Sequence, residues 1–192
     1  ALLVRVVGSE RGVVTTATYE AREFGVHSGM GLMKAAQKAP DAVLLPANFE
    51  AYRDFSRRFK AAVAGVAPVI EDRGIDEIYI DLTDFTEDSV SLARRIKAAV
   101  RAATGLSCSI GITPNKLLAK IASDLDKPDG ICVLTAEDVP TRIWPLPVRR
   151  INGIGPKAGA RLQTTGVNTV GQLAAVADSV LAAEFGGTMG RA

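Results

Sequence analysis

The stretch Gly74-Ile75-Asp76-Glu77-Ile78-Tyr79-Ile80-Asp81 places two adjacent carboxylates at the head of a strand-like alternation. Ile78 and Ile80 fall on one face of that strand, and Tyr79 and Asp81 fall on the other. Neighbouring carboxylates repel each other, and they are costly beside apolar side chains unless a cation compensates them. Magnesium takes oxygen ligands, usually one or two protein carboxylates together with substrate phosphates. The stretch therefore indicates either a metal platform for phosphate chemistry or an acidic turn that leads into a solvated strand.

The turn around the acid pair decides whether both carboxylates can serve one site. Strands are expected over residues 68–70 and 75–82, with a turn at residues 71–74. Successive residues of a strand point to opposite faces. Asp76 and Glu77 therefore share a site only if the strand is twisted, bulged or just beginning there.

Composition bounds the class of protein. The sequence has 192 residues, of which 47% are hydrophobic and 23% charged, which suits a globular protein of one or two domains or several small subdomains. The net charge of +2 does not by itself indicate a nucleic-acid partner. Cys108 and Cys132 lie in apolar strand-like runs without metal-ligand spacing, which favours a reducing compartment. With no run long enough for a bilayer and no secretory leader pattern, we expect a cytoplasmic protein.

The first quarter of the chain reads as a hairpin followed by short helices. Residues 2–7 and 13–18 form the two predicted strands around a polar turn, a helical turn follows to Gly25, and a helix is expected over residues 32–39. Thr16, Tyr19 and Arg22 leave the second strand together. An Arg in such a place can hold a phosphate through two hydrogen bonds, but an ordinary surface position is the alternative.

The middle of the chain alternates strands and helices. Asn48 is a plausible cap for a helix that carries an aromatic stripe. We expect this stripe to be core rather than a base-stacking platform, and it consists of Phe49, Tyr52, Phe55 and Phe59. A helix closed by Gly105, a strand over residues 106–112, a helix capped by Asn115 and a strand over residues 131–134 follow. This order predicts an α+β fold with a sheet layered by two helices.

The last third is helical, and it contains the most specific motif of the chain. Arg150-Ile151-Asn152-Gly153-Ile154-Gly155-Pro156-Lys157 places two glycines in a tight turn before a helix that carries Arg161. Glycine lets the backbone approach a phosphate, and the N–H groups at a helix start favour an anion. The pattern is that of the helix-hairpin-helix in sequence-independent DNA binding, and an ordinary helix turn is the alternative.

Taken together, these motifs resemble the Y-family translesion DNA polymerases, most closely the DNA polymerase IV (DinB) branch. Four ordered segments carry the resemblance, at residues 16–26, 74–81, 111–130 and 151–157. The resemblance implies a ferredoxin-like palm sheet with two helices, a small fingers subdomain and a helical thumb with the helix-hairpin-helix. It divides the chain into fingers over residues 1–47, palm over 48–134 and thumb over 135–192.

The same resemblance implies template-directed, error-prone DNA synthesis past damaged bases, in the service of DNA repair, by two-metal nucleotidyl transfer. Primer-template DNA and deoxynucleoside triphosphates would be the substrates, with two Mg²⁺ ions as cofactors and a sliding clamp as a further partner through a region after residue 192. The resemblance assigns metal binding and catalysis to Asp76 and Glu77. It assigns nucleotide binding to Thr16, Tyr19, Arg22 and Lys127, and DNA binding to Gly153, Gly155, Lys157 and Arg161.

The chain also departs from the family pattern. Gly74 and Gly31 stand where the family usually has Ser and Pro. The resemblance further implies another catalytic Asp and a ribonucleotide-excluding aromatic residue on a strand before residue 1, and a little-finger domain after residue 192. We therefore expect residues 1–192 alone to be inactive. A catalytically inactive relative that binds DNA or partner proteins in the damage response is one alternative. A nucleotidyl cyclase is another, although it would have no use for the helix-hairpin-helix.

Overall fold

The computed structural model describes residues 2–8 and 12–185. The chain divides into two compact units, residues 1–56 and residues 57–192, and each is described by itself. Part of the predicted hairpin turn, residues 9–11, lies outside the described residues. The division into fingers, palm and thumb at residues 47 and 134 stays a prediction.

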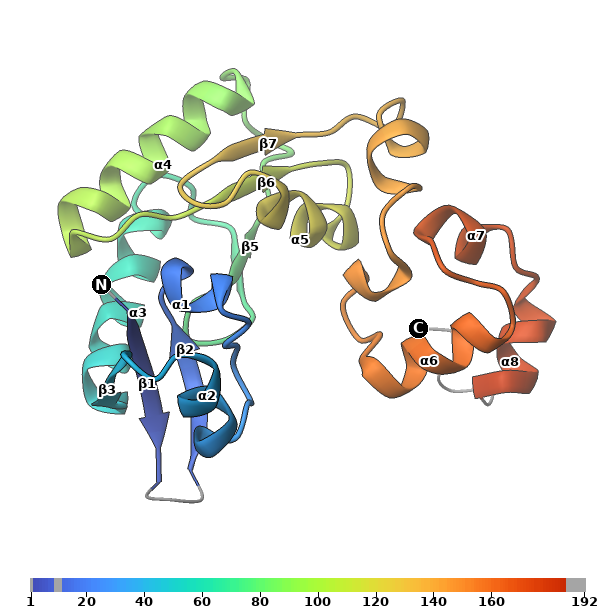
Figure 1. The fold of residues 1–192 in the computed structure, drawn as a ribbon. Coiled ribbons are helices and arrows are strands. Elements are labelled where there is room, and N and C mark those ends of the chain that lie inside the picture. The colour runs from blue at the N-terminus through green and yellow to red at the C-terminus, as the bar shows by residue number, and fades with distance from the viewer. Residues whose placement is uncertain (1, 9–11, 186–192) are drawn as a thin grey trace. The chain divides into compact units, whose positions relative to one another are not determined.

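The first unit is built on a three-stranded sheet in the order β2-β1-β3 (Figure 1). Strands β1 (Leu3–Val7) and β2 (Val13–Ala17) pair antiparallel, as the sequence predicts, and β3 (Val43–Pro46) pairs parallel with β1. Helices α1 (Tyr19–Glu23) and α2 (Leu32–Lys38) complete the unit. Its core consists of Val4, Val14, Ala17, Ala21, Val26, Met30, Ala35 and Ala39.

Helix α3 (Phe49–Ala64) begins in the first unit and ends in the second. The Asn48 side chain accepts a hydrogen bond of 3.0 Å from the Ala51 N–H, which confirms the predicted cap. The aromatic stripe is only partly core. Phe59 packs against the buried cluster of the second unit, but Phe49 is 49% exposed and meets Tyr52 edge to face. The prediction of a core stripe is therefore wrong for Phe49, because the residues at the start of α3, from Asn48 to Glu50, are exposed.

The second unit contains two short ladders. Strands β4 (Ile70–Asp72) and β5 (Ile78–Ile80) pair antiparallel, and β6 (Ile110–Ile112) and β7 (Ile131–Val133) pair parallel. The predicted order of strands and helices is present, but these four strands pair as two ladders rather than as one continuous sheet. The strand expected over residues 106–112 is shorter than predicted, and Leu106 is half exposed.

Helices α4 (Ser89–Thr104) and α5 (Lys116–Leu125) cover opposite faces of the β6–β7 ladder (Figure 1). Ile110 joins the cluster of α4, whereas Cys132, from the neighbouring register position, joins the cluster of α5. Gly111 makes the approach of α5 possible, because a Cβ there would lie 2.4 Å from the Ala119 carbonyl oxygen. The helix boundaries that the sequence predicts at Gly105 and Asn115 are confirmed.

The rest of the described chain is helical. Two short helical turns, η1 (Val139–Ile143) and η2 (Val148–Arg150), precede α6 (Pro156–Thr164), α7 (Val170–Ala174) and α8 (Asp178–Phe185). Val148, Leu162 and Val167 form the buried centre of this region. Throughout the described residues, every helix is too short or too polar to cross a bilayer. The α+β fold class is confirmed.

Candidate active site and nucleic-acid interface

The acid pair sits in the turn that leads into β5, not inside a strand. β4 extends to Asp72 and β5 begins at Ile78, so the turn spans residues 73–77 and the predicted turn at 71–74 is displaced. The Asp72 side chain accepts from the Gly74 N–H at 3.0 Å, and Gly74 takes a φ of +151° that favours glycine. Asp76 and Glu77 are both exposed here. Because the strand is only beginning, the opposite-face rule does not separate their side chains.

A lysine of α5 compensates the acid pair. The Lys120 ammonium forms an ion pair with the Glu77 carboxylate, and the Lys120 side chain is only 23% exposed. Burial of Lys120 opposes its charge, but the hydrogen bond to Glu77 and the nearby carboxylates of Asp124 and Asp76 outweigh that burial and raise the pKa of Lys120. Lys120 is a site residue that the sequence reasoning missed. The signal was its spacing from Lys116, because residues four apart share one helix face.

Lys116, one turn earlier on α5, contacts both strands of the β4–β5 ladder. Its ammonium pairs with Glu71 and lies 5.9 Å from the centroid of the Tyr79 ring. The hydrogen bond from Lys116 lowers the pKa of Glu71, although Glu71 is exposed. The pKa of Asp81, at the end of β5, is lowered chiefly by the hydroxyl hydrogen bond from Thr83. These hydrogen bonds favour the ionised forms of Glu71 and Asp81.

Lys127 follows α5 and is paired locally. Its ammonium lies 2.6 Å from the Asp124 carboxylate, three residues earlier, and its side chain is 42% exposed. The ion pair is therefore a surface pair that solvent screens. Contact between Lys127 and a triphosphate, as the resemblance implies, requires exchange of this weak partner for a stronger anionic one.

The donor chemistry of the acid turn fits a hard divalent ion in part. Asp76 and Glu77 offer exposed carboxylate oxygens, which Mg²⁺ prefers. Within residues 2–8 and 12–185, however, no group of three or more His, Cys, Asp or Glu side chains is placed to hold a metal. The pair can therefore supply some of the ligands of an ion whose remaining ligands are water or phosphate oxygens.

The three predicted nucleotide-binding residues of the first unit lie at the end of β2 and on α1. Thr16, Tyr19 and Arg22 are all exposed, whereas Ala17 and Ala21 between them are buried. The Arg22 Nε donates to the Ala17 carbonyl oxygen at 3.0 Å, and its guanidinium lies 5.1 Å from the centroid of the Tyr19 ring. These two contacts fix the direction of the Arg22 side chain, while the rest of its fork can still meet an anion.

The glycine turn of the predicted DNA-binding motif has the expected backbone. Gly153 takes a φ of +95°, and the Gly155 N–H donates to the Gly153 carbonyl at 3.1 Å. Gly155 is the N-cap of α6 and Pro156 is its first residue, where a missing N–H costs nothing. A Cβ at Gly153 or Gly155 would meet no atom within 4 Å, so the outer side of this turn is open. The first N–H groups of α6, from Lys157 onward, are placed to receive an anion.

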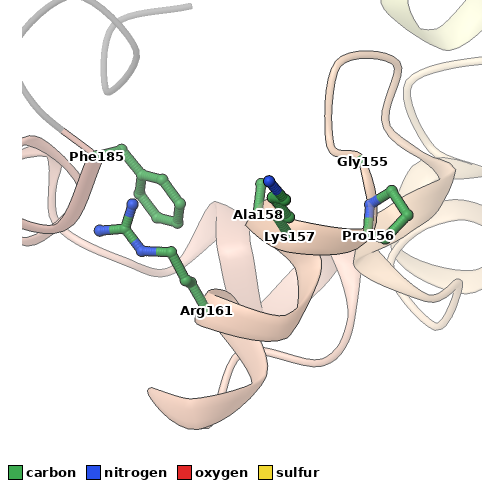
Figure 2. Close-up of a pocket in the computed structure, with 6 residues that line it drawn as sticks. All are labelled: Gly155, Pro156, Lys157, Ala158, Arg161 and Phe185. Atoms are coloured by element: carbon green, nitrogen blue, oxygen red, sulfur yellow. The ribbon is translucent and has the colours of Figure 1, made fainter.

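Lys157 and Arg161 stand one turn apart on α6 beside this opening. They line a cavity of about 560 Å³ together with Gly155, Pro156, Ala158 and Phe185 (Figure 2). The Arg161 guanidinium lies 4.7 Å from the centroid of the Phe185 ring. Three of the four predicted DNA-binding residues, Gly155, Lys157 and Arg161, therefore line one cavity, while Gly153 lies in the adjoining turn. The cavity also includes Phe185 of α8, which no sequence pattern indicated.

Comparison with known proteins finds two family matches that follow each other along the chain. Residues 2–124 match the impB/mucB/samB family, and residues 136–167 match the helix-hairpin-helix motif of the same family. The two matches cover the acid turn, the candidate nucleotide-binding residues of the first unit and the glycine turn, whereas Lys127 lies between them.

Individual relatives give the same result. The chain is 38% identical over 182 residues to DNA polymerase IV of Moorella thermoacetica, covering 93% of this chain and 46% of that protein. It is 44% identical over 169 residues to DNA polymerase IV of Methanoculleus marisnigri, covering 87% of this chain and 47% of that protein. The chain thus spans about half the length of these relatives.

Solved structures share the fold. DinB from Sulfolobus solfataricus superposes with a TM-score of 0.87 at 33% identity, over 99% of this chain and 57% of that one. An insertion ternary complex of Dbh DNA polymerase superposes equally well, with a TM-score of 0.87 at 34% identity, over 99% of this chain and 58% of that one. With two family matches, named relatives and shared fold in agreement, the chain belongs to the impB/mucB/samB family, and its resemblance to the Y-family polymerases of the DNA polymerase IV branch is confirmed.

Proposed function

We propose that the protein to which this chain contributes is a DNA-directed DNA polymerase that copies damaged templates. The observation that carries the proposal is the pair of exposed carboxylates, Asp76 and Glu77, at the head of β5 in a chain of this family. Neither carboxylate belongs to the core, and although Glu77 pairs with Lys120, both residues are exposed at the turn. The glycine turn before α6, in the same unit, supports a nucleic-acid substrate.

The proposal gives each candidate residue a role. Asp76 and Glu77 would hold divalent ions, which, when bound, would assist attack by the primer 3′ oxygen and departure of pyrophosphate. Tyr19, Arg22 and Lys127 would neutralise the triphosphate, and Thr16 would donate a hydroxyl hydrogen bond. The N–H groups that follow Gly155, with Lys157 and Arg161, would hold the DNA backbone.

The same proposal covers the division of the chain into domains and its cellular location. We assign residues 1–47 to fingers, 48–134 to palm and 135–192 to thumb, as the resemblance implies. The cytoplasm suits the two free cysteines, since burial raises the pKa of both Cys108 and Cys132 and keeps the less reactive thiol form.

Primer extension tests the proposal. Because the chain spans about half of its relatives, the assay uses a polypeptide extended to their full length, with Mg²⁺, four deoxynucleotides and a primer-template. Asp76→Asn keeps the size of the side chain and removes its charge, and we expect at least an approximately 100-fold loss of extension. Asp84→Asn is the matched control, because Asp84 is an exposed acid of the same unit outside the turn.

Equal extension by the Asp76→Asn variant and the parent would overturn the assignment of the acid pair. A parent that binds the duplex and never extends it, at any divalent ion concentration, would favour the inactive relative instead. A lesion-bearing template, with an abasic site in the template strand, then tests the translesion part of the proposal by comparison with an undamaged template.

A further inference from the structure

The cavity beside α6 combines apolar and cationic walls in a way that the sequence motif does not explain. Pro156, Ala158 and the Phe185 ring supply the apolar wall, and Lys157 and Arg161 supply the charge (Figure 2). Four of its six lining residues belong to α6, Gly155 is the N-cap of that helix, and the sixth, Phe185, comes from α8. The last residue of α8 thus completes a cavity that begins at the glycine turn.

Phe185 has a fixed place because it also belongs to the core. It packs, with Leu181 of the same helix, against the cluster formed by Val148, Leu162 and Val167. The Arg161 guanidinium lies on this ring at 4.7 Å from its centroid, and Figure 2 shows the two groups side by side. A guanidinium plane on an aromatic ring is held by the negative face of the ring, and its rotamer freedom is reduced. Packing of α8 against α6 therefore sets the direction of the Arg161 side chain.

We propose that Phe185 is a positioning residue for DNA binding, and that the cavity takes one sugar-phosphate unit of the DNA backbone. This inference rests on the proposed function and deepens it. The deoxyribose is apolar enough to lie against Pro156 and Ala158, while its phosphate meets the cations and the first N–H groups of α6. Arg161 then pays less of its side-chain entropy on binding, because the ring has already ordered it.

A double-mutant cycle in DNA binding tests this inference. The purified chain and a fluorescein-labelled primer-template are titrated by anisotropy at several KCl concentrations. Phe185→Leu keeps an apolar side chain on α8 and removes the ring, and we expect affinity to fall about two- to five-fold, the range of an exposed cation–π contact. Arg161→Ala removes one ionic contact and lowers the slope of log affinity against log salt by about one. In the Arg161→Ala background, Phe185→Leu should have no further effect on affinity.

Two further variants separate positioning from folding. Phe185→Tyr keeps the ring and should bind as the parent does. Leu181→Ala weakens the packing of α8 without touching the cavity, so thermal unfolding should shift while Arg161 keeps its effect on affinity. Equal losses from Phe185→Leu in both backgrounds, or no loss in either, would overturn the positioning role alone. A parent chain without salt-dependent DNA binding would instead overturn the proposed interface and this inference with it.

Discussion

The turn before β5 and the turn before α6 are both exposed, and each is expected to meet phosphate, but they are built from different parts of the chain. The first consists of side chains: Asp76 and Glu77 project from a short turn, and Lys120 reaches across from α5 to compensate them. The second consists of backbone: Gly153 and Gly155 shape the turn, and the N–H groups of α6 form its surface. A site made of side chains is sensitive to the loss of charge on one group. A site made of backbone N–H groups is instead sensitive to added atoms that block the approach of a phosphate.

The largest effect is expected from a substitution that removes the charge of a side chain and keeps its shape. Glu77→Gln, in the full-length polypeptide, should reduce primer extension by at least about 100-fold, because a neutral amide binds a divalent ion far less well than a carboxylate. Affinity for the duplex should stay within about two-fold of the parent, since Glu77 belongs to no DNA-binding surface of this proposal. Steady-state extension and anisotropy are measured on the same preparation. Parallel losses in both would mean that the two turns do not act separately.

A smaller effect is expected from the first unit, where the site is again built of side chains. Arg22→Ala should raise the KM for the incoming nucleotide by roughly 10-fold or more, the value of a charged hydrogen bond. Arg5→Ala is the matched control, because Arg5 is also an arginine of this unit with a backbone acceptor, Pro46, and a ring contact to Tyr52. An Arg22→Ala variant that loses nucleotide and duplex affinity equally would remove Arg22 from the nucleotide site.

The turn before α6 is tested by a pair of glycine variants. Gly155 has a φ of −75° that alanine adopts freely, and a Cβ there meets no atom, so Gly155→Ala should fold normally. Its methyl group should still lower duplex affinity by a few-fold to about 10-fold, because it stands where a phosphate would approach. Gly153→Ala, at a φ of +95°, should cost about 1 kcal/mol of stability as well. Thermal melts and anisotropy separate these outcomes, and full affinity in Gly155→Ala would place the phosphate elsewhere.

The smallest expected effect concerns acid pH and the β4–β5 ladder. The pKa of Glu71 is lowered from 4.5 by Lys116, and that of Asp72 is lowered from 3.8 by the hydrogen bond from Lys60. Carboxyl groups with a depressed folded pKa add stability above their unfolded pKa and lose it as the pH falls through the folded value. The melting temperature should therefore hold from pH 7 to 5 and decline below about 4.5. Glu71→Gln should flatten part of that decline. The same decline in the variant and the parent would exclude a role for the Glu71–Lys116 pair.

Local sequence signals predicted most of the fold correctly. Asn48 and Asn115 cap their helices, Gly105 ends α4 with a φ of +74°, and both strands of the first hairpin lie where alternation places them. Each of these features depends on a few consecutive residues, which is why a pattern can indicate it.

The sequence was least informative where distant residues meet. Lys120 pairs with Glu77 from 43 positions away, and no periodicity connects the two. The strand expected from Leu106 is unpaired as far as residue 109, because pairing depends on the length of its partner β7. Phe49 has the spacing of a core residue and remains half exposed. Phe185 could not be placed on Arg161 until the packing of α8 against α6 was known.

The ion pair between Lys120 and Glu77 has a consequence for the stability of the acid turn. A covalently attached ammonium is a counterion that dilution cannot remove, so the repulsion within the acid pair is offset without a dissolved ion. The turn should therefore keep its shape in the presence of a chelator, unlike small domains whose fold is assembled by their metal. A divalent ion that reaches Glu77 must compete with this internal counterion, and the displaced ammonium is then available to an anionic ligand brought to the same place.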